Sequence, residues 1–381
     1  MANFYMPKIS LMGADSLKEI AGEIKDLHVK KALIVTDKIL IKVGVAEKLT
    51  SILKSNKIDF VLFDGVKPNP TVQLVNEGLA ALKANNCDFI ISLGGGSAHD
   101  CSKGMALLAT NGGKIEDYEG VNKSEKPMMP LMCVNTTAGT ASEMTLFAII
   151  TNEETHVKMA LVDKNLTPNI AINDPLLMLD MPKGLTAATG MDALTHAVEA
   201  YVAKGATPIT DACAEKAIVL IAKHLEEAVS NGKNIEAREQ MAYAEYLAGM
   251  AFNNAGLGYV HAIAHQLGGF YNLPHGVCNA VLLPHVQKFN TQVAAKRLQE
   301  VGILMGLDIA GLSEEKGAQA CITAIKELSS RVGIPAGLEE LGVKKVDFPT
   351  LTANALKDVC GFANPIEAKT SDIMTILGEA F

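Results

Sequence analysis

The feature that most constrains the fold of this chain is a change in its hydrophobic pattern near residue 180. Before that point, short apolar runs rich in β-branched residues alternate with amphipathic helical stretches. This alternation is typical of parallel strands joined by crossover helices. After the turn-rich segment 180–184, strand signals nearly disappear and long segments rich in Ala, Leu, Glu and Lys follow. The pattern predicts an α/β domain over residues 1–181 and an all-α domain, a helical bundle, over residues 182–381.

In the first domain we expect a doubly wound, Rossmann-like parallel sheet. Helices are predicted over residues 71–85 and 98–108, and long helices of the second domain over residues 211–229 and 234–251. The predicted strands cover residues 30–37, 59–64, 88–93 and 130–135, with 157–162 and 169–173 as two further strands.

Length and composition limit the class of protein. A chain of 381 residues has room for about two domains with full hydrophobic cores. Its 49% of hydrophobic and 20% of charged residues are typical of a folded rather than a disordered protein. The net charge of −8 argues against nucleic acid as a partner, because no excess of Lys and Arg is present to neutralise phosphates. The seven cysteines are scattered without a C-x-x-C pair, which favours buried reduced thiols over disulfides.

The start of the sequence and its apolar runs predict a cytoplasmic protein. The first eight residues lack the basic and apolar regions of a secretory signal. Apolar segments such as 89–93 and 217–222 are much shorter than the roughly 20 residues needed to cross a bilayer. We therefore expect no membrane among its partners.

Three consecutive glycines and a serine, Gly94 to Ser97, stand between a predicted strand and a predicted helix. Glycines let a ligand approach the backbone, and the N-terminus of the helix offers free N–H groups and a positive dipole end. These properties predict a phosphate-binding loop, although the segment matches neither G-x-G-x-x-G nor a Walker A loop. The alternative is a glycine-rich turn without a ligand, and the loop alone does not decide between them. Asp100 and Lys103, one turn further on, fit a binding site but also a solvated helix face.

A second polar cluster, Asn135 to Thr140, follows another predicted strand and carries three hydroxyl groups. In a doubly wound sheet, loops at the carboxyl ends of neighbouring strands converge on one crevice, so this cluster could face the same ligand. The alternative, which the cluster by itself favours, is a hydroxyl-rich turn that caps the next helix. Asp37, at the end of the first predicted strand, could accept a hydrogen bond from a ribose hydroxyl or could cap a helix.

The strongest local pattern lies in the helical domain. Asp192 and His196 are spaced i, i+4, as are His261 and His265, and His275 follows in a Pro-His-Gly segment. Residues at that spacing share one face of a helix. One carboxylate and several imidazoles from separate segments predict a divalent transition-metal site. The alternative is a set of core histidines that only form hydrogen bonds. It is less favoured because the residues around them are mostly Ala, Gly and Leu, which offer few side-chain partners to a buried imidazole.

Other metal and nucleophile chemistries are disfavoured. Ala262 occupies the position at which a zinc peptidase carries its Glu base, which argues against peptide hydrolysis. The sequence has no G-x-S-x-G segment and no recognisable Cys–His arrangement. Covalent nucleophilic catalysis therefore has no candidate.

Five segments together resemble the iron-containing alcohol dehydrogenase family, group III, over essentially the whole chain. They are Gly94 to Ser97 with Asp100 and Lys103, NTTAGTASE at 135–143, GMDALTH at 190–196, GYVHAIAH at 258–265 and NLPHG at 272–276. The similarity is greatest to the bacterial fermentative type and smaller to lactaldehyde reductase and 1,3-propanediol dehydrogenase. The resemblance implies a dehydroquinate synthase-like architecture, with NAD held by the α/β domain, Fe²⁺ by the helical domain, and the active site in the cleft between them. It also implies at least a homodimer.

Matched position by position, the resemblance implies roles for individual residues. The metal ligands are Asp192, His196, His261 and His275, and His265 is a non-ligand histidine near the nicotinamide. The residues that bind or line the cofactor are Asp37 at the adenosine ribose, Asn69, then Gly95, Gly96 and Ser97 at the pyrophosphate, Asp100, Thr136, Thr137, Thr145, Phe147 and Lys158. These ligand types also accept Zn²⁺. Two positions depart from the family pattern. Ala98 replaces a common Pro, which loosens a turn, and Leu146 replaces an Arg found in close relatives, which removes a charge near the cofactor or substrate and leaves substrate preference open.

The implied activity is the interconversion of small primary alcohols and aldehydes with NAD(H), in which hydride leaves a metal-bound alkoxide. His265 is a candidate to pass the alcohol proton towards solvent, or else only stacks beside the site. Alternative activities are those of lactaldehyde reductase, 1,3-propanediol dehydrogenase or a glycerol dehydrogenase-like polyol oxidoreductase; His196 as a fourth ligand argues against the last. Alternatives from other classes are a metal-dependent hydrolase of a phosphorylated substrate and a non-catalytic subunit of an assembly.

Overall fold

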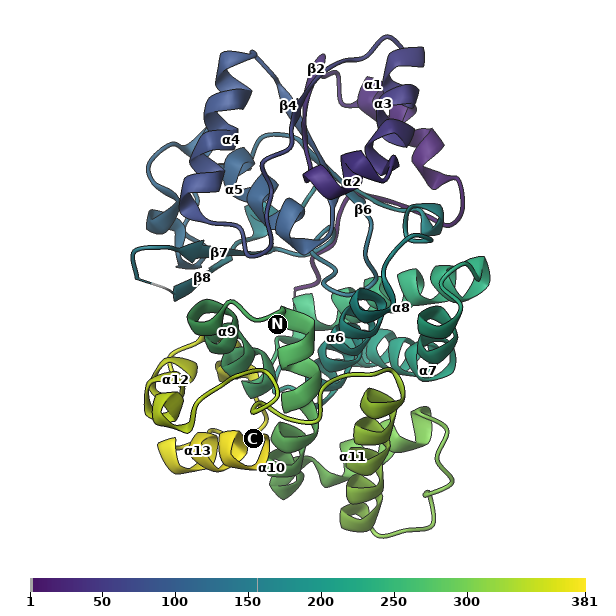
Figure 1. Cartoon of the computed structure of the whole chain (residues 1–381), viewed down its shortest axis with the longest axis vertical. Helices are drawn as coiled ribbons and strands as arrows, with labels where there is room; N and C mark the ends of the chain where they lie inside the picture. The colour runs from purple at the N-terminus through teal and green to yellow at the C-terminus, as the bar shows by residue number, and fades with distance from the viewer. Residues whose placement is uncertain (1–2, 156) are drawn as a thin grey trace. The chain divides into compact units, whose positions relative to one another are not determined.

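The computed structural model describes residues 3–155 and 157–381. The chain folds into two compact units: an α/β unit with residues up to 137 and 141–179, and a helical unit with residues 138–140 and 180–381. In Figure 1 the first unit runs from purple to teal and the second continues to yellow. The loop at 138–140 thus groups with the helices, although the sequence pattern assigns it to the α/β domain.

The α/β unit is built on a sheet of six parallel strands in the order β1-β9-β6-β4-β2-β3. Five of the six match predicted strands, so the expected doubly wound sheet is confirmed. The sixth strand, β1, was not among the predicted strands. The strands are β1 (Ile9–Met12), β2 (Lys31–Val35), β3 (Asp59–Phe63), β4 (Phe89–Gly94), β6 (Leu131–Asn135) and β9 (Ile170–Asn173).

Alternate side chains of the strands fill two hydrophobic cores, one on each face of the sheet. In β2, Leu33 and Val35 face the core that α4 and α5 cover, while Ala32 and Ile34 face the core that α1 and α3 cover. Because both faces are buried, these strands are nearly continuous apolar runs in the sequence. The helices of this unit are α1 (Ile20–Asp26), α2 (Lys38–Lys42), α3 (Val45–Ser55), α4 (Val72–Ala84) and α5 (Gly96–Asn111).

A second sheet of three strands holds the predicted strand 157–162. Its strands are β5 (Gly120–Val121), β7 (Phe147–Asn152) and β8 (Val157–Val162), in the order β5-β8-β7. β7 and β8 pair antiparallel, with Phe147 opposite Val162. β8 also pairs parallel with β5. The predicted strand 157–162 is therefore confirmed, but it lies in this second sheet and not in the six-stranded parallel sheet.

The helical unit confirms the expected bundle, and the predicted helices 211–229 and 234–251 lie within α7 and α8. Its central helix is α6, which packs against α7, α8 and α10 and buries nearly every side chain after its first turn. The helices are α6 (Lys183–Val202), α7 (Pro208–Ser230), α8 (Ile235–Ala255), α9 (Tyr259–Tyr271), α10 (His275–Leu304), α11 (Glu314–Arg331), α12 (Phe348–Ala355) and α13 (Thr370–Glu379). Short 3-10 helices in the whole chain are η1 (Ser16–Glu19), η2 (Ile115–Tyr118), η3 (Lys164–Leu166), η4 (Pro175–Leu177), η5 (Lys345–Asp347) and η6 (Val359–Ala363).

The start of α10 approaches α6 unusually closely. A Cβ atom on Gly276 would lie 2.4 Å from the carbonyl oxygen of Ala188 and 3.3 Å from the Cβ atom of Asp192. Only glycine permits this approach. It brings His275, the first residue of α10, to the face of α6 that carries Asp192.

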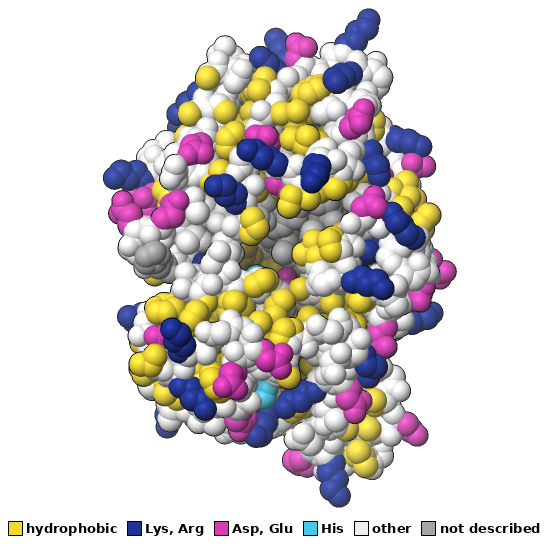
Figure 2. All heavy atoms as spheres, viewed as in Figure 1, with side chains coloured by type: hydrophobic (Ala, Val, Ile, Leu, Met, Phe, Trp, Pro, Cys, Tyr) yellow, Lys and Arg dark blue, Asp and Glu magenta, His cyan; other side chains and the backbone are white. Residues whose placement is uncertain are grey.

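The surface and the cysteines agree with the compositional expectations. All seven cysteines are buried free thiols. Figure 2 shows Lys and Arg interspersed with Asp and Glu on the visible face of each unit, rather than a field of one sign. Among the described residues, the structure has no helix with the length and apolar character needed to cross a bilayer.

Candidate active site

The order of the strands reverses between β2 and β4. From β2 the chain continues to β3 at one edge, then returns to β4 on the other side of β2. In open α/β sheets, ligands bind at such a switch point, outside the carboxyl ends of the strands. Asp37 follows β2, the glycine loop follows β4 and Thr136 follows β6, and the N–H of Thr136 donates to the carbonyl oxygen of Gly94. The structure therefore brings three of the predicted cofactor segments to one end of the sheet.

The glycine loop packs against the hydroxyl-rich loop beside it. Gly95 is the N-cap of α5, and the residues Gly95 to Ser97 are partly exposed. A Cβ atom on Gly95 would lie 2.7 Å from Oγ1 of Thr137. Because Gly95 has no side chain to cap the helix, the first N–H groups of α5 suit an anionic ligand.

Asp37 caps α2. Its Oδ1 atom accepts hydrogen bonds from the backbone N–H groups of Ile39 at 2.7 Å and Leu40 at 2.9 Å. The capping interpretation of Asp37 is therefore confirmed. Its contact with a ribose stays a prediction.

Asp100 and Lys103 join α5 to the segment before β7. Lys103 is fully buried, and its Nζ donates to the carbonyl oxygens of Thr145 at 2.8 Å and Phe147 at 2.7 Å. Asp100 accepts hydrogen bonds from the hydroxyl of Ser142 at 2.6 Å and the N–H of Ile149 at 3.1 Å. Burial lowers the pKa of Lys103 and raises that of Asp100, and the attraction between them opposes both shifts. A solvated helix face is therefore wrong for Lys103, which holds the segment carrying Thr145 and Phe147 in place.

The other predicted cofactor residues lie on turns and strand ends of the α/β unit. Asn69 has a left-handed backbone with φ 56°, which Asn tolerates better than most residues. Thr137 donates its N–H to Oδ1 of Asn135, and Lys158 lies on β8 opposite Thr151. Their contacts with a cofactor stay predictions.

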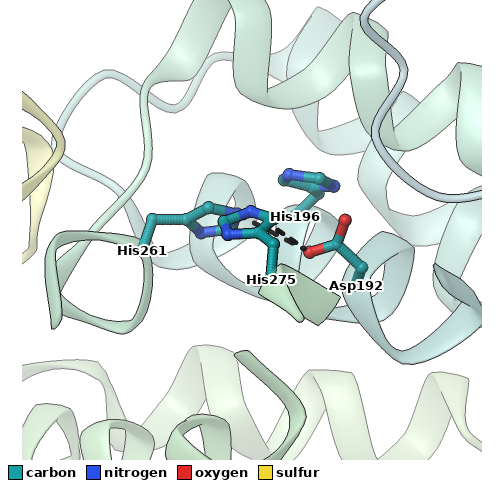
Figure 3. Close-up of side chains that lie close together, drawn as sticks. All are labelled: Asp192, His196, His261 and His275. Carbon is teal, nitrogen blue, oxygen red and sulfur yellow. Dashed lines mark ion pairs between the residues drawn. The ribbon is translucent and has the colours of Figure 1, made fainter. Parts of the chain in front are cut away.

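The four predicted metal ligands converge in the helical unit. Asp192 and His196 come from α6, His261 from α9 and His275 from the start of α10. One ligand atom from each lies within 4.8 Å of all the others. Figure 3 shows the four side chains pointing toward one another. The first three are buried, whereas the side chain of His275 keeps 26% of its surface exposed.

The distances between the ligand atoms fit a divalent cation. Oδ1 of Asp192 lies 3.7 Å from Nε2 of His275 and 4.0 Å from Nε2 of His261. Ligands about 2.1 Å from one ion in a tetrahedral arrangement are about 3.4 Å apart, so a small contraction suffices. The amide nitrogen of Asn279 lies 2.6 Å from Oδ1 of Asp192 and 3.1 Å from each of those Nε2 atoms. The Asn279 amide therefore lies among the same three atoms that would bind the cation.

The imidazoles are held with Nε2 toward the cluster. Nδ1 of His196 donates to the carbonyl oxygen of Gly139 at 3.2 Å, and Nδ1 of His261 donates to Glu199 at 2.6 Å. The ring of His196 is stacked between those of Phe252 and His261, at centroid distances of 4.3 and 4.5 Å. Burial lowers the pKa of His196 to about 3 and that of His261 well below its usual value. Both are therefore neutral near pH 7, as a metal ligand must be.

His265 lies beside this cluster and has its own carboxylate. Its Nδ1 donates to Oδ2 of Asp358 at 2.9 Å, and its ring stacks on that of His275 at 5.5 Å between centroids. Cys360 is close enough to join them as a further metal-binding trio. However, burial holds the pKa of the Cys360 thiol well above its usual range, and Asp358 already accepts from His265 and from the N–H of Cys360. We interpret this trio as a hydrogen-bonded network rather than a metal site.

Three residues at the site were not singled out in the sequence. Glu199 follows Asp192 by seven positions and so lies on the same face of α6, a spacing that could have found it. Asn279 is one helical turn after His275, which is a weaker signal. Asp358 lies 93 residues from His265, and only the tertiary structure joins them.

A parallel sheet with a glycine loop at its switch point and a helical unit with a carboxylate–imidazole cluster define the class of nicotinamide- and metal-dependent oxidoreductases. Residues 7–175 match the family model "Iron-containing alcohol dehydrogenase", and residues 186–381 match "Fe-containing alcohol dehydrogenase family, C-terminal". The chain belongs to the iron-containing alcohol dehydrogenase family. It is therefore an enzyme, an alcohol dehydrogenase of the metal-dependent and NAD-dependent kind.

Individual relatives agree over the whole chain. Alcohol dehydrogenase 4 of Schizosaccharomyces pombe is 56% identical over 99% of this chain and 88% of its own length. NAD-dependent methanol dehydrogenase of Bacillus methanolicus is 48% identical over all of both chains. The crystal structure of a 1,3-propanediol oxidoreductase, 49% identical, superposes over all of both chains with a TM-score of 0.98.

Proposed function

We propose that this protein interconverts small primary alcohols and aldehydes with NAD(H), and that Asp192, His196, His261 and His275 hold Fe²⁺ for this reaction. The observation that carries the proposal is the convergence of one carboxylate and three imidazoles, whose ligand atoms lie within 4.8 Å of one another. A bound divalent iron would supply a Lewis acid toward the oxygen of the alcohol or aldehyde.

The chain's own residues prepare this chemistry. The backbone of Gly139 and the carboxylate of Glu199 orient His196 and His261. Phe252 covers the outer face of His196 and keeps water from that side of the ring. His275 is the most exposed of the four, so we propose that substrate enters beside it.

His265 is proposed to accept the proton of the alcohol and to return it in aldehyde reduction. Because its Nδ1–H donates to Asp358, Nε2 is the free acceptor. The attraction of His265 lowers the pKa of Asp358 against the opposing effect of burial, so the carboxylate is ionised and can stabilise the imidazolium. Asp358 thus acts through His265 as a positioning residue.

In the α/β unit, the proposed roles in NAD binding are inferred from the reversal of strand order between β2 and β4. The N–H groups of Gly95, Gly96 and Ser97 bind the pyrophosphate of NAD, and Asp37 accepts from the adenosine ribose. Asn69, Asp100, Thr136, Thr137, Thr145, Phe147 and Lys158 are proposed to line the rest of the cofactor.

The test is an NADH absorbance assay with C1 to C4 alcohols and aldehydes, NAD or NADP, and protein loaded with Fe²⁺, Zn²⁺ or no metal. We expect turnover with NAD and short primary alcohols in the Fe²⁺-loaded protein, and none without metal. Preference for 1,3-propanediol, lactaldehyde or glycerol would select one of the alternative activities. Undiminished turnover in fully metal-free protein would contradict the proposed role of the four residues.

The oligomeric state and the cytoplasmic location stay predictions. Analytical ultracentrifugation tests the expected homodimer or larger homo-oligomer, and a monomer at micromolar concentration would contradict it.

A further inference from the structure

Glu199 is a buried carboxylic acid residue on α6, the helix that carries Asp192 and His196, and it contacts a third metal-ligand candidate, His261. Glu199 of α6 is 1% exposed and follows Asp192 and His196 by seven and three positions. The three side chains therefore share one face of the helix. Glu199 is not one of the four converging ligand atoms, so its place on this face needs another reason.

The two carboxylate oxygens of Glu199 have different partners. Oε2 accepts a hydrogen bond from Nδ1 of His261 at 2.6 Å, and Oε1 accepts one from the backbone N–H of Val260 at 2.7 Å. A Cβ atom on Gly258 would lie 2.7 Å from Oε1, so glycine at the N-cap of α9 leaves room for the carboxylate. Glu199 thus connects α6 to the first turn of α9.

We propose that Glu199 is the positioning residue of the metal centre: by accepting the Nδ1–H of His261 it fixes the tautomer and ring orientation that turn Nε2 toward Asp192. The inference rests on the proposed metal role of these residues. In the other tautomer Nε2 would carry the hydrogen and could not bind a cation.

The hydrogen bond from His261 to Glu199 has a second effect on cation retention. A carboxyl group placed behind a ligand histidine raises the basicity of the imidazole, and Glu199 holds that position behind His261.

The competing interpretation is that Glu199 only caps α9 through Val260. That role affects folding stability but leaves the tautomer and the metal affinity unchanged.

The chain offers a matched control, because Asp358 is also a buried carboxylate that accepts from the Nδ1–H of a histidine, His265, at 2.9 Å. His265 is not among the four converging ligands.

The experiment compares the full-length wild type with Glu199→Gln, Glu199→Asp and Asp358→Asn. The dissociation constant for Zn²⁺ is measured by competition with a chromophoric chelator, and the ring ¹⁵N shifts of His261 are measured in metal-free, ¹⁵N-histidine-labelled protein. Gln keeps the length but replaces one of the two accepting oxygens by an amide NH₂ group, whereas Asp keeps the carboxyl group but withdraws it by one methylene. We expect Zn²⁺ to bind about 10- to 100-fold more weakly to both Glu199 variants, and within about 3-fold of wild type to Asp358→Asn. The ¹⁵N shifts of Glu199→Gln should report a mixture of tautomers.

Each outcome decides the question. Zn²⁺ affinity within about 3-fold of wild type in a folded Glu199→Gln protein, or an unchanged tautomer, would overturn the proposal, even if the melting temperature fell. Equal weakening by Asp358→Asn would overturn it too, because the effect would not be specific to a ligand histidine. If Glu199→Gln does not fold, Glu199→Asp carries the same test. A wild type that binds no metal would instead contradict the proposed function.

Discussion

Nδ1 of His196 lies 3.2 Å from the carbonyl oxygen of Gly139, and this contact joins the loop 138–140 to the helical unit. The loop reaches α6 because Gly139 has no side chain. A Cβ atom there would lie 2.6 Å from Cβ of Thr189 and 2.8 Å from its carbonyl oxygen. A residue that the sequence pattern places in a hydroxyl-rich turn of the first domain therefore orients a metal-ligand candidate of the second.

Gly139→Ala should weaken metal binding by about 10-fold or more, because the loop must move away from α6 and His196 loses its acceptor. Metal affinity is measured by chelator competition. The control is Gly184→Ala, in the first turn of the same helix, where an added Cβ meets nothing within 4 Å. Equal affinities in the two variants would remove Gly139 from the site.

His275→Ala should lower metal affinity by more than about 100-fold, since a ligand contributes more than the groups behind it. The fold should persist, because His275 is partly exposed at the first position of α10. Elemental analysis and the melting temperature of the metal-free protein are the measurements. Stoichiometric metal with full turnover in the variant would exclude His275 as a ligand.

An added Cβ at Gly95 should block NADH, but Gly95→Ala alone would also collide with Thr137. The informative comparison is Gly95→Ala/Thr137→Ala against Thr137→Ala. Thr137→Ala removes Oγ1 and Cγ2, which would lie 2.7 and 2.9 Å from the new Cβ, so the double variant fits without a ligand. We expect NADH to bind more weakly to the double variant than to Thr137→Ala in a fluorescence titration, with equal metal content in the two proteins. Equal titrations would mean that the loop is only a turn.

Asp37→Asn should shift cofactor preference from NAD toward NADP. Asn keeps an oxygen for the N–H groups of Ile39 and Leu40, so α2 stays capped, while the charge that repels a 2′-phosphate is lost. A partly screened charge contact contributes about 1–3 kcal/mol, so the ratio of kcat/KM for NAD and NADP should change by about 10-fold or more. An unshifted ratio would show that Asp37 is only a cap.

His99→Gln should make the metal-free protein less sensitive to acid. Burial, and then the charge of Lys103, lower the pKa of His99 to about 3, so it stays neutral in the folded protein. The unfolded chain takes up a proton below about pH 6.5, so the free energy of unfolding falls between pH 6.5 and 3 by up to about 1.4 kcal/mol per pH unit. Urea unfolding at pH 7, 6, 5 and 4 measures the slope. The same slope in His99→Gln and wild type would mean that His99 is protonated in the folded state.

The elements of both units follow from local patterns. Strands such as β2 and β4 are buried on both faces and therefore appear as short apolar runs, and α7 and α8 appear as long helical segments. Only the pairing with β7 and β5 places β8 in the second sheet, because its own six residues are mostly apolar, like those of the central strands of the first sheet. The short strand β1 becomes a strand through its partner β9 rather than through its own pattern.

By itself, the sequence determined which chemical groups are present and which of them share a helix face, because the i, i+4 spacing of Asp192 and His196 is local. It also marked the loops that end the central strands. Only the tertiary structure decided that Asp358 lies behind His265 and Gly139 behind His196, since those partners are 93 and 57 residues apart. It also decided that Lys103 is buried rather than solvated. The physical reason is that a hydrogen bond between distant segments forms only after the hydrophobic cores have packed the helices together, and no local pattern records that packing.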